Sequence, residues 1–206
     1  NHQDYLNVAG DPYLYINEDG SIDPSLSLWE TYEQTDETTI VANLRHDVKF
    51  HDGRDFRAED VKNILEFITV EENVPNFGFF SWLSNFKSAE VIDEYTVKIN
   101  ADAPDASFLW VFCLVPGVPY SMDKVEKLGD DELRAPALTG PYTIESYTED
   151  VGWMMVANPD YWGPKDLAPT FDRVEYIGIR DPKVKAAALQ AGDLDAAWFG
   201  ASDEST

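Results

Sequence analysis

The sequence predicts a mixed α and β fold, in which β-hairpins are inserted between an N-terminal segment and a C-terminal strand, helix and strand unit. Two periodicities favour this class, because apolar residues alternate with a period of two in some segments and recur at helical spacing in others. The third observation is the size of the chain. Its 206 residues, 44% of them apolar, suffice for one sizeable core or for one domain and part of a second.

The first clear strand signal covers residues 39–45, where Ile40, Ala42 and Leu44 alternate with Val41, Asn43 and Arg45. A period of two is typical of a strand with one buried face. A second extended piece, residues 48–50, runs into Asp52 and the glycine that follows it. This pair is typical of an exposed turn.

Helical spacing follows directly in AEDVKNILEFI, residues 58–68, and predicts an amphipathic helix packed on a core. The apolar face is expected to consist of Val61, Ile64, Leu65 and Ile68, and the opposite, polar face of Glu59, Asp60, Lys62 and Glu66. Two of these carboxylates fall in the first turn, where they suit the partial positive charge of the backbone amides.

Two hairpins are predicted further along the chain. The first spans residues 89–100 and turns at Asp93 and Glu94, and the second joins YTIESY to WMMVAN through residues 148–152. Between them, SFLWVFCLVPG (residues 107–117) is apolar without a clear period. It could form either a buried strand or a short helix.

The C-terminal third reads as a strand, a helix and a second strand. RVEYIGI is the first strand, Asp181 and Pro182 suit the cap and first position of a helix, Gly192 ends that helix, and LDAAWF is the second strand. Strands joined in this way are expected to run parallel through a right-handed crossover.

The charge balance argues against some partners. The formal net charge of −24 should repel phosphate backbones, so no nucleic acid partner is expected. The acidity fits a solvated surface, and a salt-rich or acidic environment is the alternative. Cys113 is the only cysteine and lies in the apolar run, so it is expected to be buried and not to act as a nucleophile.

No catalytic residue, metal site or cofactor is predicted. His46 and His51 lie near carboxylates, but zinc needs three or four ligands, so both are expected to be exposed at a strand end and a turn. A carboxylate pair for glycoside hydrolysis has no specific signal among 39 acidic residues, and no GxSxG turn is present. The aromatic stretch NFGFFSWLSNF could instead pack around an organic ligand, or close a small lobe.

Five blocks occur in a recognisable order: DGSIDPSLSLWETYE, LRHDVKFHDGRDFRAEDV, LTGPYTIESY, ANPDYWGP and ALQAGDLDAAW. In this order they resemble the family 5 extracellular solute-binding proteins, the oligopeptide, dipeptide and nickel receptors of ABC importers. The second block is the most specific. Two positions depart from the family pattern: Arg57 stands where Thr or Ser usually caps the helix, so Asp55 or water is expected to cap it, and Leu138 replaces a glycine.

The resemblance implies the fold of a periplasmic-binding-protein-like class II lobe I fragment with an inserted small β-rich subdomain. Residues 1–20 and 159–206 would be part of the main α/β subdomain and residues 21–158 the insertion, with the second lobe and an N-terminal strand absent. It also implies a receptor outside the cytoplasmic membrane, lipid-anchored in its full-length form. Such a receptor captures a peptide or similar small solute and delivers it to an ABC permease without any catalysis.

By the same resemblance, three segments are expected to line the cleft: Val8, Ala9 and Gly10; Phe79, Phe80 and Trp82; and Val115, Pro116 and Gly117. The fragment alone is expected to bind solute weakly or not at all, because the groups of the other lobe are missing. The main alternative is a surface adhesion or scaffold module that retains a solute-binding lobe, and a third is an acidic secreted hydrolase.

Overall fold

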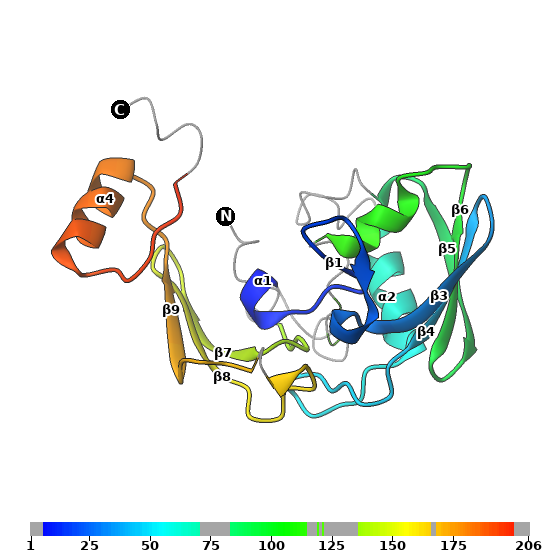
Figure 1. Cartoon of the computed structure of the whole chain (residues 1–206), viewed down its shortest axis with the longest axis horizontal. Coiled ribbons are helices and arrows are strands. Elements are labelled where there is room, and N and C mark those ends of the chain that lie inside the picture. The colour runs from blue at the N-terminus through cyan, green and yellow to red at the C-terminus, as the bar shows by residue number, and fades with distance from the viewer. Residues whose placement is uncertain are drawn as a thin grey trace.

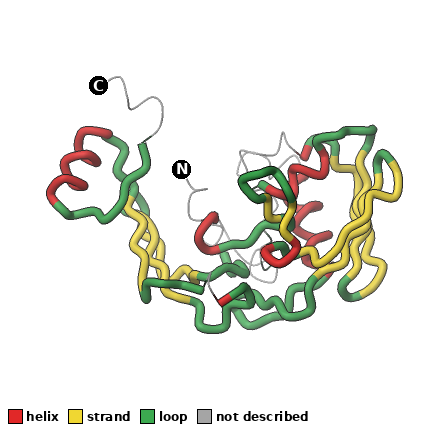
Figure 2. Tube along the Cα trace, in the orientation of Figure 1, coloured by secondary structure: helices red, strands yellow, loops and turns green. Residues whose placement is uncertain are grey.

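The computed structural model describes residues 6–70, 83–114, 119, 121, 136–165 and 168–199. These residues form one pair of short strands and two larger groups of strands, which long loops join (Figures 1 and 2). In chain order the elements are α1 (Leu6–Ala9), β1 (Tyr15–Ile16), β2 (Ile22–Asp23), η1 (Pro24–Leu26), β3 (Trp29–Asp36), β4 (Thr39–Leu44), α2 (Ala58–Thr69), β5 (Phe86–Asp93), β6 (Thr96–Ala101), η4 (Phe108–Cys113), β7 (Tyr142–Thr148), β8 (Gly152–Ala157), β9 (Arg173–Ile177) and α4 (Pro182–Ala191). The mixed α and β class is confirmed.

The first group, called the body here, is an antiparallel sheet with the order β3-β4-β6-β5 and with α2 packed against β5 and β6. The sheet and α2 lie side by side in Figure 1. The predicted inward faces are confirmed: Ile40, Ala42 and Leu44 of β4 are buried, and so is the predicted apolar face of α2. The hairpin at Asp93 is also confirmed.

The start of α2 corrects two expectations. Asp60 lies in the interior, with its Oδ2 accepting a hydrogen bond from the backbone N–H of Arg57 at 2.8 Å. The carboxylate of Asp60 therefore holds Arg57, the residue just before the helix, whereas Asp55 or water was expected to accept from the first turn. Asp55 pairs instead with the side chains of Lys49 and Arg57. Placing Asp60 on the polar face was wrong, because its oxygens have partners in the interior.

The ambiguous apolar run forms η4, a short 3₁₀ helix, which decides between the two predicted alternatives. Its tight winding buries Phe108, Val111 and Phe112 and leaves Cys113 at the edge of the core. Cys113 is half-buried, so the expectation of full burial was too strong. Partial burial raises the pKa of its thiol, which disfavours the nucleophilic thiolate.

The second group, called the arm here, consists of the antiparallel sheet β7-β8-β9 followed by α4. The predicted β7–β8 hairpin is confirmed, and α4 begins and ends as expected. Asp181 accepts hydrogen bonds from the N–H groups of Lys183 and Val184, and Gly192 closes the helix with φ +79°. The cap and the left-handed terminus are the features that fix both ends of this helix.

The predicted parallel crossover is wrong for the described part of the chain. Residues 194–199 form no strand, and β9 pairs only with β8, in antiparallel orientation. Instead, the Lys185 ammonium donates to the Trp198 carbonyl at 2.8 Å and lies 5.2 Å from the centre of the Phe199 ring, which holds this segment against α4. LDAAWF was expected to pair with the strand before the helix, but the outer edge of β9 has no partner strand among the described residues.

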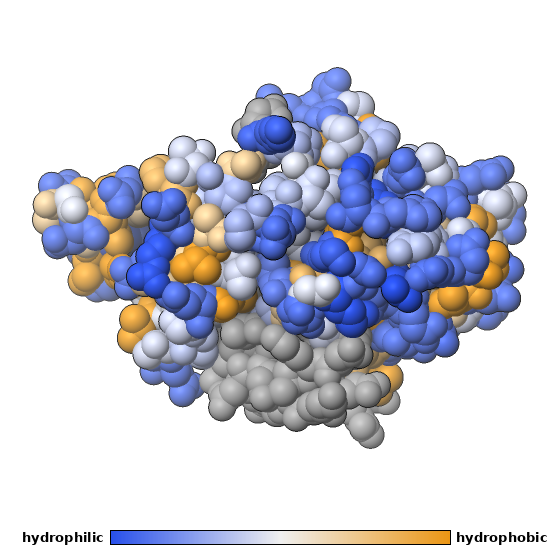
Figure 3. Space-filling view, turned by 90° about the horizontal axis from the view of Figure 1, so that it is seen from below, coloured by the Kyte–Doolittle hydropathy of each residue, from blue (hydrophilic) through white to orange (hydrophobic). Residues whose placement is uncertain are grey.

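The arm exposes many of its apolar side chains. Trp198 is 84% exposed and Phe171 is 69% exposed, and α4 has no buried residue. Apolar residues gather at this end of the molecule in Figure 3. The predicted boundary at residue 158 falls between β8 and β9, and the division into subdomains stays a prediction. Within the described ranges, no helix is long and apolar enough to span a bilayer.

Candidate functional site

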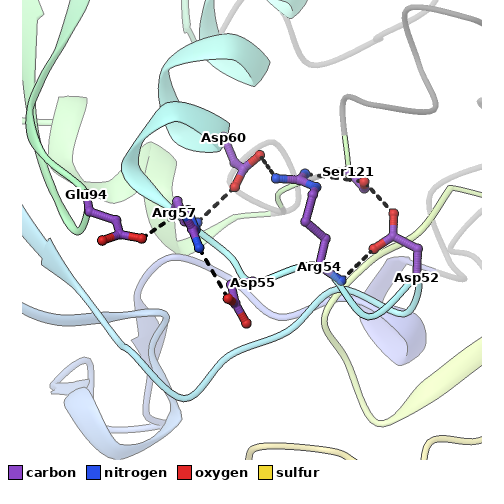
Figure 4. Close-up of polar contacts among 7 residues, drawn as sticks. All are labelled: Asp52, Arg54, Asp55, Arg57, Asp60, Glu94 and Ser121. Carbon is purple, nitrogen blue, oxygen red and sulfur yellow. Dashed lines mark hydrogen bonds and ion pairs between the residues drawn. The ribbon is translucent and has the colours of Figure 1, made fainter.

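The block LRHDVKFHDGRDFRAEDV forms a polar network that holds a turn and the start of α2 together (Figure 4). Arg54 is its centre: its guanidinium pairs with Asp60 at 2.7 Å and donates to the Ser121 hydroxyl at 3.3 Å. The Ser121 hydroxyl in turn donates to Asp52 at 2.6 Å. At the other end, Arg57 pairs with Glu94 at 2.7 Å. Since both arginines of the network are engaged by carboxylates, the block has a structural role, holding the turn to the helix start.

His51 joins the turn to a second, remote segment of the chain. Its Nε2 lies 3.0 Å from the Gly140 carbonyl oxygen, and the backbone N–H of Leu138 approaches its Nδ1 at 3.4 Å. These contacts fit a neutral imidazole with the proton on Nε2. The expectation of an exposed His51 was wrong, because the ring is half-buried between the turn and residues 138–140. His46 is exposed as predicted and stacks on Tyr95.

The described part of the chain offers no metal site. It contains no group of three or more His, Cys, Asp or Glu side chains that could hold an ion. The imidazole nitrogens of His51 both lie at backbone groups of the loop before β7. This agrees with the chemistry of a structural histidine rather than of a ligand.

Residues 8–10, called the candidate cleft segment here, are the only predicted site residues within the described ranges. Val8 is half-buried and packs against the core, whereas Ala9 and Gly10 are buried. The Ala9 carbonyl accepts a hydrogen bond from Gly140 N–H at 2.9 Å. A Cβ at Gly140 would lie 2.5 Å from the Ala9 carbonyl carbon, so glycine permits this close approach. The other six residues, Phe79, Phe80, Trp82, Val115, Pro116 and Gly117, lie outside the described residues.

Immediately after this segment, Asp11 anchors a cluster that sequence reasoning missed. Its Oδ2 accepts hydrogen bonds from Thr139 Oγ1 at 2.9 Å and from Trp162 Nε1 at 2.8 Å, and its Oδ1 accepts one from the Tyr161 hydroxyl at 3.0 Å. These four residues are called the junction cluster here. Asp11 is only 6% exposed. The cluster ties the start of the chain to both ends of the β7–β8 hairpin.

Burial dominates the electrostatics of the junction cluster. Desolvation raises the pKa of Asp11, although the hydrogen bonds from Trp162, Thr139 and Tyr161 act in the opposite direction. Burial and the neighbouring Asp11 carboxylate also raise the pKa of the Tyr161 phenol. The guanidinium of Arg45 lies 4.7 Å from the centre of the Trp162 ring. Its Nε and Nη2 both donate to Asp47, each at 2.9 Å.

Comparison with known proteins identifies the family. The glutathione-binding protein GsiB of Salmonella choleraesuis (strain SC-B67) is 30% identical over 172 residues, which are 83% of this chain and 33% of GsiB. The chain thus spans about a third of the length of the curated relatives it matches.

Solved structures agree in fold. NikA from Brucella suis in complex with Fe(III)-EDTA is 28% identical with a TM-score of 0.76, and 92% of this chain matches 37% of that one. AgaA from A. tumefaciens R10, in complex with agropinic acid, is 28% identical with a TM-score of 0.80, and 94% of this chain matches 38% of AgaA. NikZ from Campylobacter jejuni, in complex with Ni(L-His), is 25% identical with a TM-score of 0.80, and 96% of this chain matches 39% of NikZ.

The family model described as bacterial extracellular solute-binding proteins, family 5 Middle, matches residues 23–206. This match takes in every strand of the body and of the arm. The chain therefore belongs to the bacterial extracellular solute-binding proteins of family 5.

Proposed function

We propose that this chain is part of the substrate-binding component of an ABC importer, which captures a peptide or similar small solute outside the membrane and delivers it to a permease. The observation that carries the proposal is the family match over residues 23–206. The names of the relatives record small solutes, among them glutathione, agropinic acid and Ni(L-His). The alternative of an adhesion or scaffold module has no comparable support.

The geometry around the candidate cleft segment supports this proposal. Ala9 and Gly10 are buried and Gly10 has no side chain, so the segment would offer its backbone and Val8 to a solute. A binding wall works best when its polar groups are held in place before the ligand arrives, because ordering them then costs nothing. The close contact with Gly140 and the neighbouring junction cluster both fix this backbone.

The remaining site residues belong to the same proposal. Phe79, Phe80 and Trp82 would supply aromatic surface, and Val115, Pro116 and Gly117 would supply a turn beside the solute. Domain closure about a hinge would then select the bound state. A permease of the cytoplasmic membrane is the proposed partner, and a lipid anchor is the proposed means of retention at the cell surface. No bond is made or broken in this function.

Calorimetry tests the proposal. The 206-residue chain and the product of the longest open reading frame that contains it are titrated with reduced glutathione, a dipeptide, a pentapeptide and Ni(II) with L-histidine. We expect saturable binding of one of these solutes by the longer product, and weak or no binding by the 206 residues alone. Free glycine, which has both charged ends but no peptide bond, is the matched control solute.

Two results would contradict the proposal. One is the absence of saturable binding by the longer product to any member of the panel. The other is chemical turnover of a bound solute, detected by mass spectrometry of the recovered ligand, since a receptor releases its solute unchanged.

A further inference from the structure

Asp11 lies at a crossing of three remote segments. Two residues before it, the Ala9 carbonyl accepts a hydrogen bond from Gly140 N–H, and Asp11 itself accepts one from the Thr139 hydroxyl. The segments around residues 9–11 and 139–140 are therefore joined at two neighbouring positions. Tyr161 and Trp162 complete the contact from the loop after β8. The Gly140 carbonyl is held in turn by Asn158 Nδ2 at 3.1 Å. The candidate cleft segment is thus followed directly by a residue that three hydrogen bonds hold in place.

We propose that Asp11 is a positioning residue that locks the candidate cleft segment onto the arm, and that this lock is tighter when the Asp11 carboxyl group is protonated. The proposal rests on the proposed function for its biological meaning, because it concerns the wall that would meet the solute. The lock itself is a property of the chain that can be measured without any solute.

The charges around Asp11 explain why protonation tightens the lock. Among the described residues, Asp11 has three neutral donors and no ion pair. The charged and titratable groups on the packed elements include Tyr161 in the loop after β8, Arg45 after β4, which is engaged with Asp47, and His51, which is hydrogen-bonded to the carbonyl of Gly140. Asp160 and Lys165 of the loop after β8 are exposed to solvent. An ionised Asp11 is therefore a buried charge without a direct cationic partner.

Protonation can keep all three contacts. The protonated oxygen can donate to the Tyr161 hydroxyl, while the other oxygen still accepts from Thr139 and Trp162. The buried charge disappears and the hydrogen bonds remain. Consistent with this, burial holds the pKa of Asp11 above the ordinary value of 3.8.

The sign of the pH dependence follows from linkage. A raised pKa means that the folded state binds the proton more tightly than the unfolded chain does. The stabilising contribution is therefore full below pH 3.8 and is lost as the pH rises through the pKa of Asp11 in the folded protein.

Two NMR readouts on the ¹⁵N-labelled 206-residue chain test the lock between pH 4.5 and 8. The indole N–H of Trp162, assigned with Trp162→Phe, should shift with a single transition as Asp11 ionises. The hydrogen-exchange protection factor of Gly140 N–H, which bonds to Ala9, should fall across the same transition. The fall is expected to approach tenfold for each unit by which the pKa of Asp11 is raised.

Variants separate the lock from a merely structural contact. Asp11→Asn keeps the shape of the neutral acid, so it should hold the acid-side protection of Gly140 at every pH and show no transition. Asp160→Asn is the matched control, because Asp160 is an exposed neighbour of Tyr161, and it should titrate like the wild type. Asp11→Ala should lose protection at every pH, and Asp11→Asn decides the question if the alanine variant does not fold.

The lock would be overturned by an indole signal of Trp162 that does not titrate, or by identical pH profiles for the wild type and Asp11→Asn. An intact transition in a protein that binds no solute would overturn only the proposed function, so the two failures can be told apart.

Discussion

Asp60 joins two contacts that stabilise the start of α2. Its Oδ2 accepts from Arg57 N–H and its Oδ1 pairs with Arg54, and the side chain is only 5% exposed. Removing a buried partner costs more than the pair contributes, because the other charge is left without compensation. We predict that Asp60→Ala lowers the free energy of unfolding by about 2–3 kcal/mol, below the usual range because Arg54 is 29% exposed.

Glu59→Ala is the matched control for this prediction. Glu59 occupies the same helical turn, but it is 59% exposed and lies 3.9 Å from Lys62. Its loss should change the free energy of unfolding by no more than about 0.5 kcal/mol. Urea denaturation measures both variants, and equal losses would show that Asp60 contributes only a surface charge.

Single residues also mark the limit of what the sequence can predict. The helical spacing assigned Asp60 to the polar face, because spacing alone does not show that Arg54 forms an ion pair with Asp60 in the interior. His51 and Asp11 find their partners 89 and 128 residues away in the chain, at Gly140 and Thr139. The pattern of neighbouring residues contains no information about contacts between such remote positions, so the junction cluster could not be predicted from the sequence.

At the scale of elements, α4 is defined by its ends rather than by its packing. It has 10 residues, none of them buried, and Asp181 caps its first turn. Helices of this length are marginal in isolation. We predict that Asp181→Ala, which removes about 1 kcal/mol of capping, unfolds α4 locally while leaving the urea midpoint of the rest of the protein unchanged.

Hydrogen exchange of the α4 amides, followed together with the urea midpoint, measures this outcome. Lys183→Ala is the control, because it changes an exposed side chain in the same turn without touching the cap. If the urea midpoint falls together with the protection of α4, the helix is part of the cooperative core and the prediction is wrong.

The elements that were predicted correctly are those specified by neighbouring residues. The β5–β6 and β7–β8 hairpins follow from short turns, and the ends of α4 follow from Asp181 and Gly192. The strand expected at residues 194–199 depended on a distant partner instead. The order of strand, helix and strand predicts a parallel pair, but whether the last segment docks beside the first strand depends on contacts that the neighbouring residues do not specify.

For the whole molecule, self-repulsion of negative charge is the dominant long-range force. The chain has 39 acidic and 15 basic residues, a formal net charge of −24. Two like charges 10 Å apart in water repel by about 0.4 kcal/mol, and many such pairs come together when the chain folds. The ion pairs on the surface offset little of this repulsion, since exposed pairs contribute about 0–1 kcal/mol each.

We therefore predict that salt stabilises the folded protein. Between about 0.05 and 1 M KCl the Debye length falls to about 3 Å, which screens the repulsion between carboxylates more than it weakens the few buried contacts. The urea midpoint at pH 7 should rise, with a gain in the free energy of unfolding on the order of 1 kcal/mol or more. Choline chloride at the same ionic strength should give the same gain, because screening depends on charge alone. A gain with KCl only would instead indicate a bound potassium ion, and a midpoint that falls with salt would mean that ion pairs outweigh the self-repulsion.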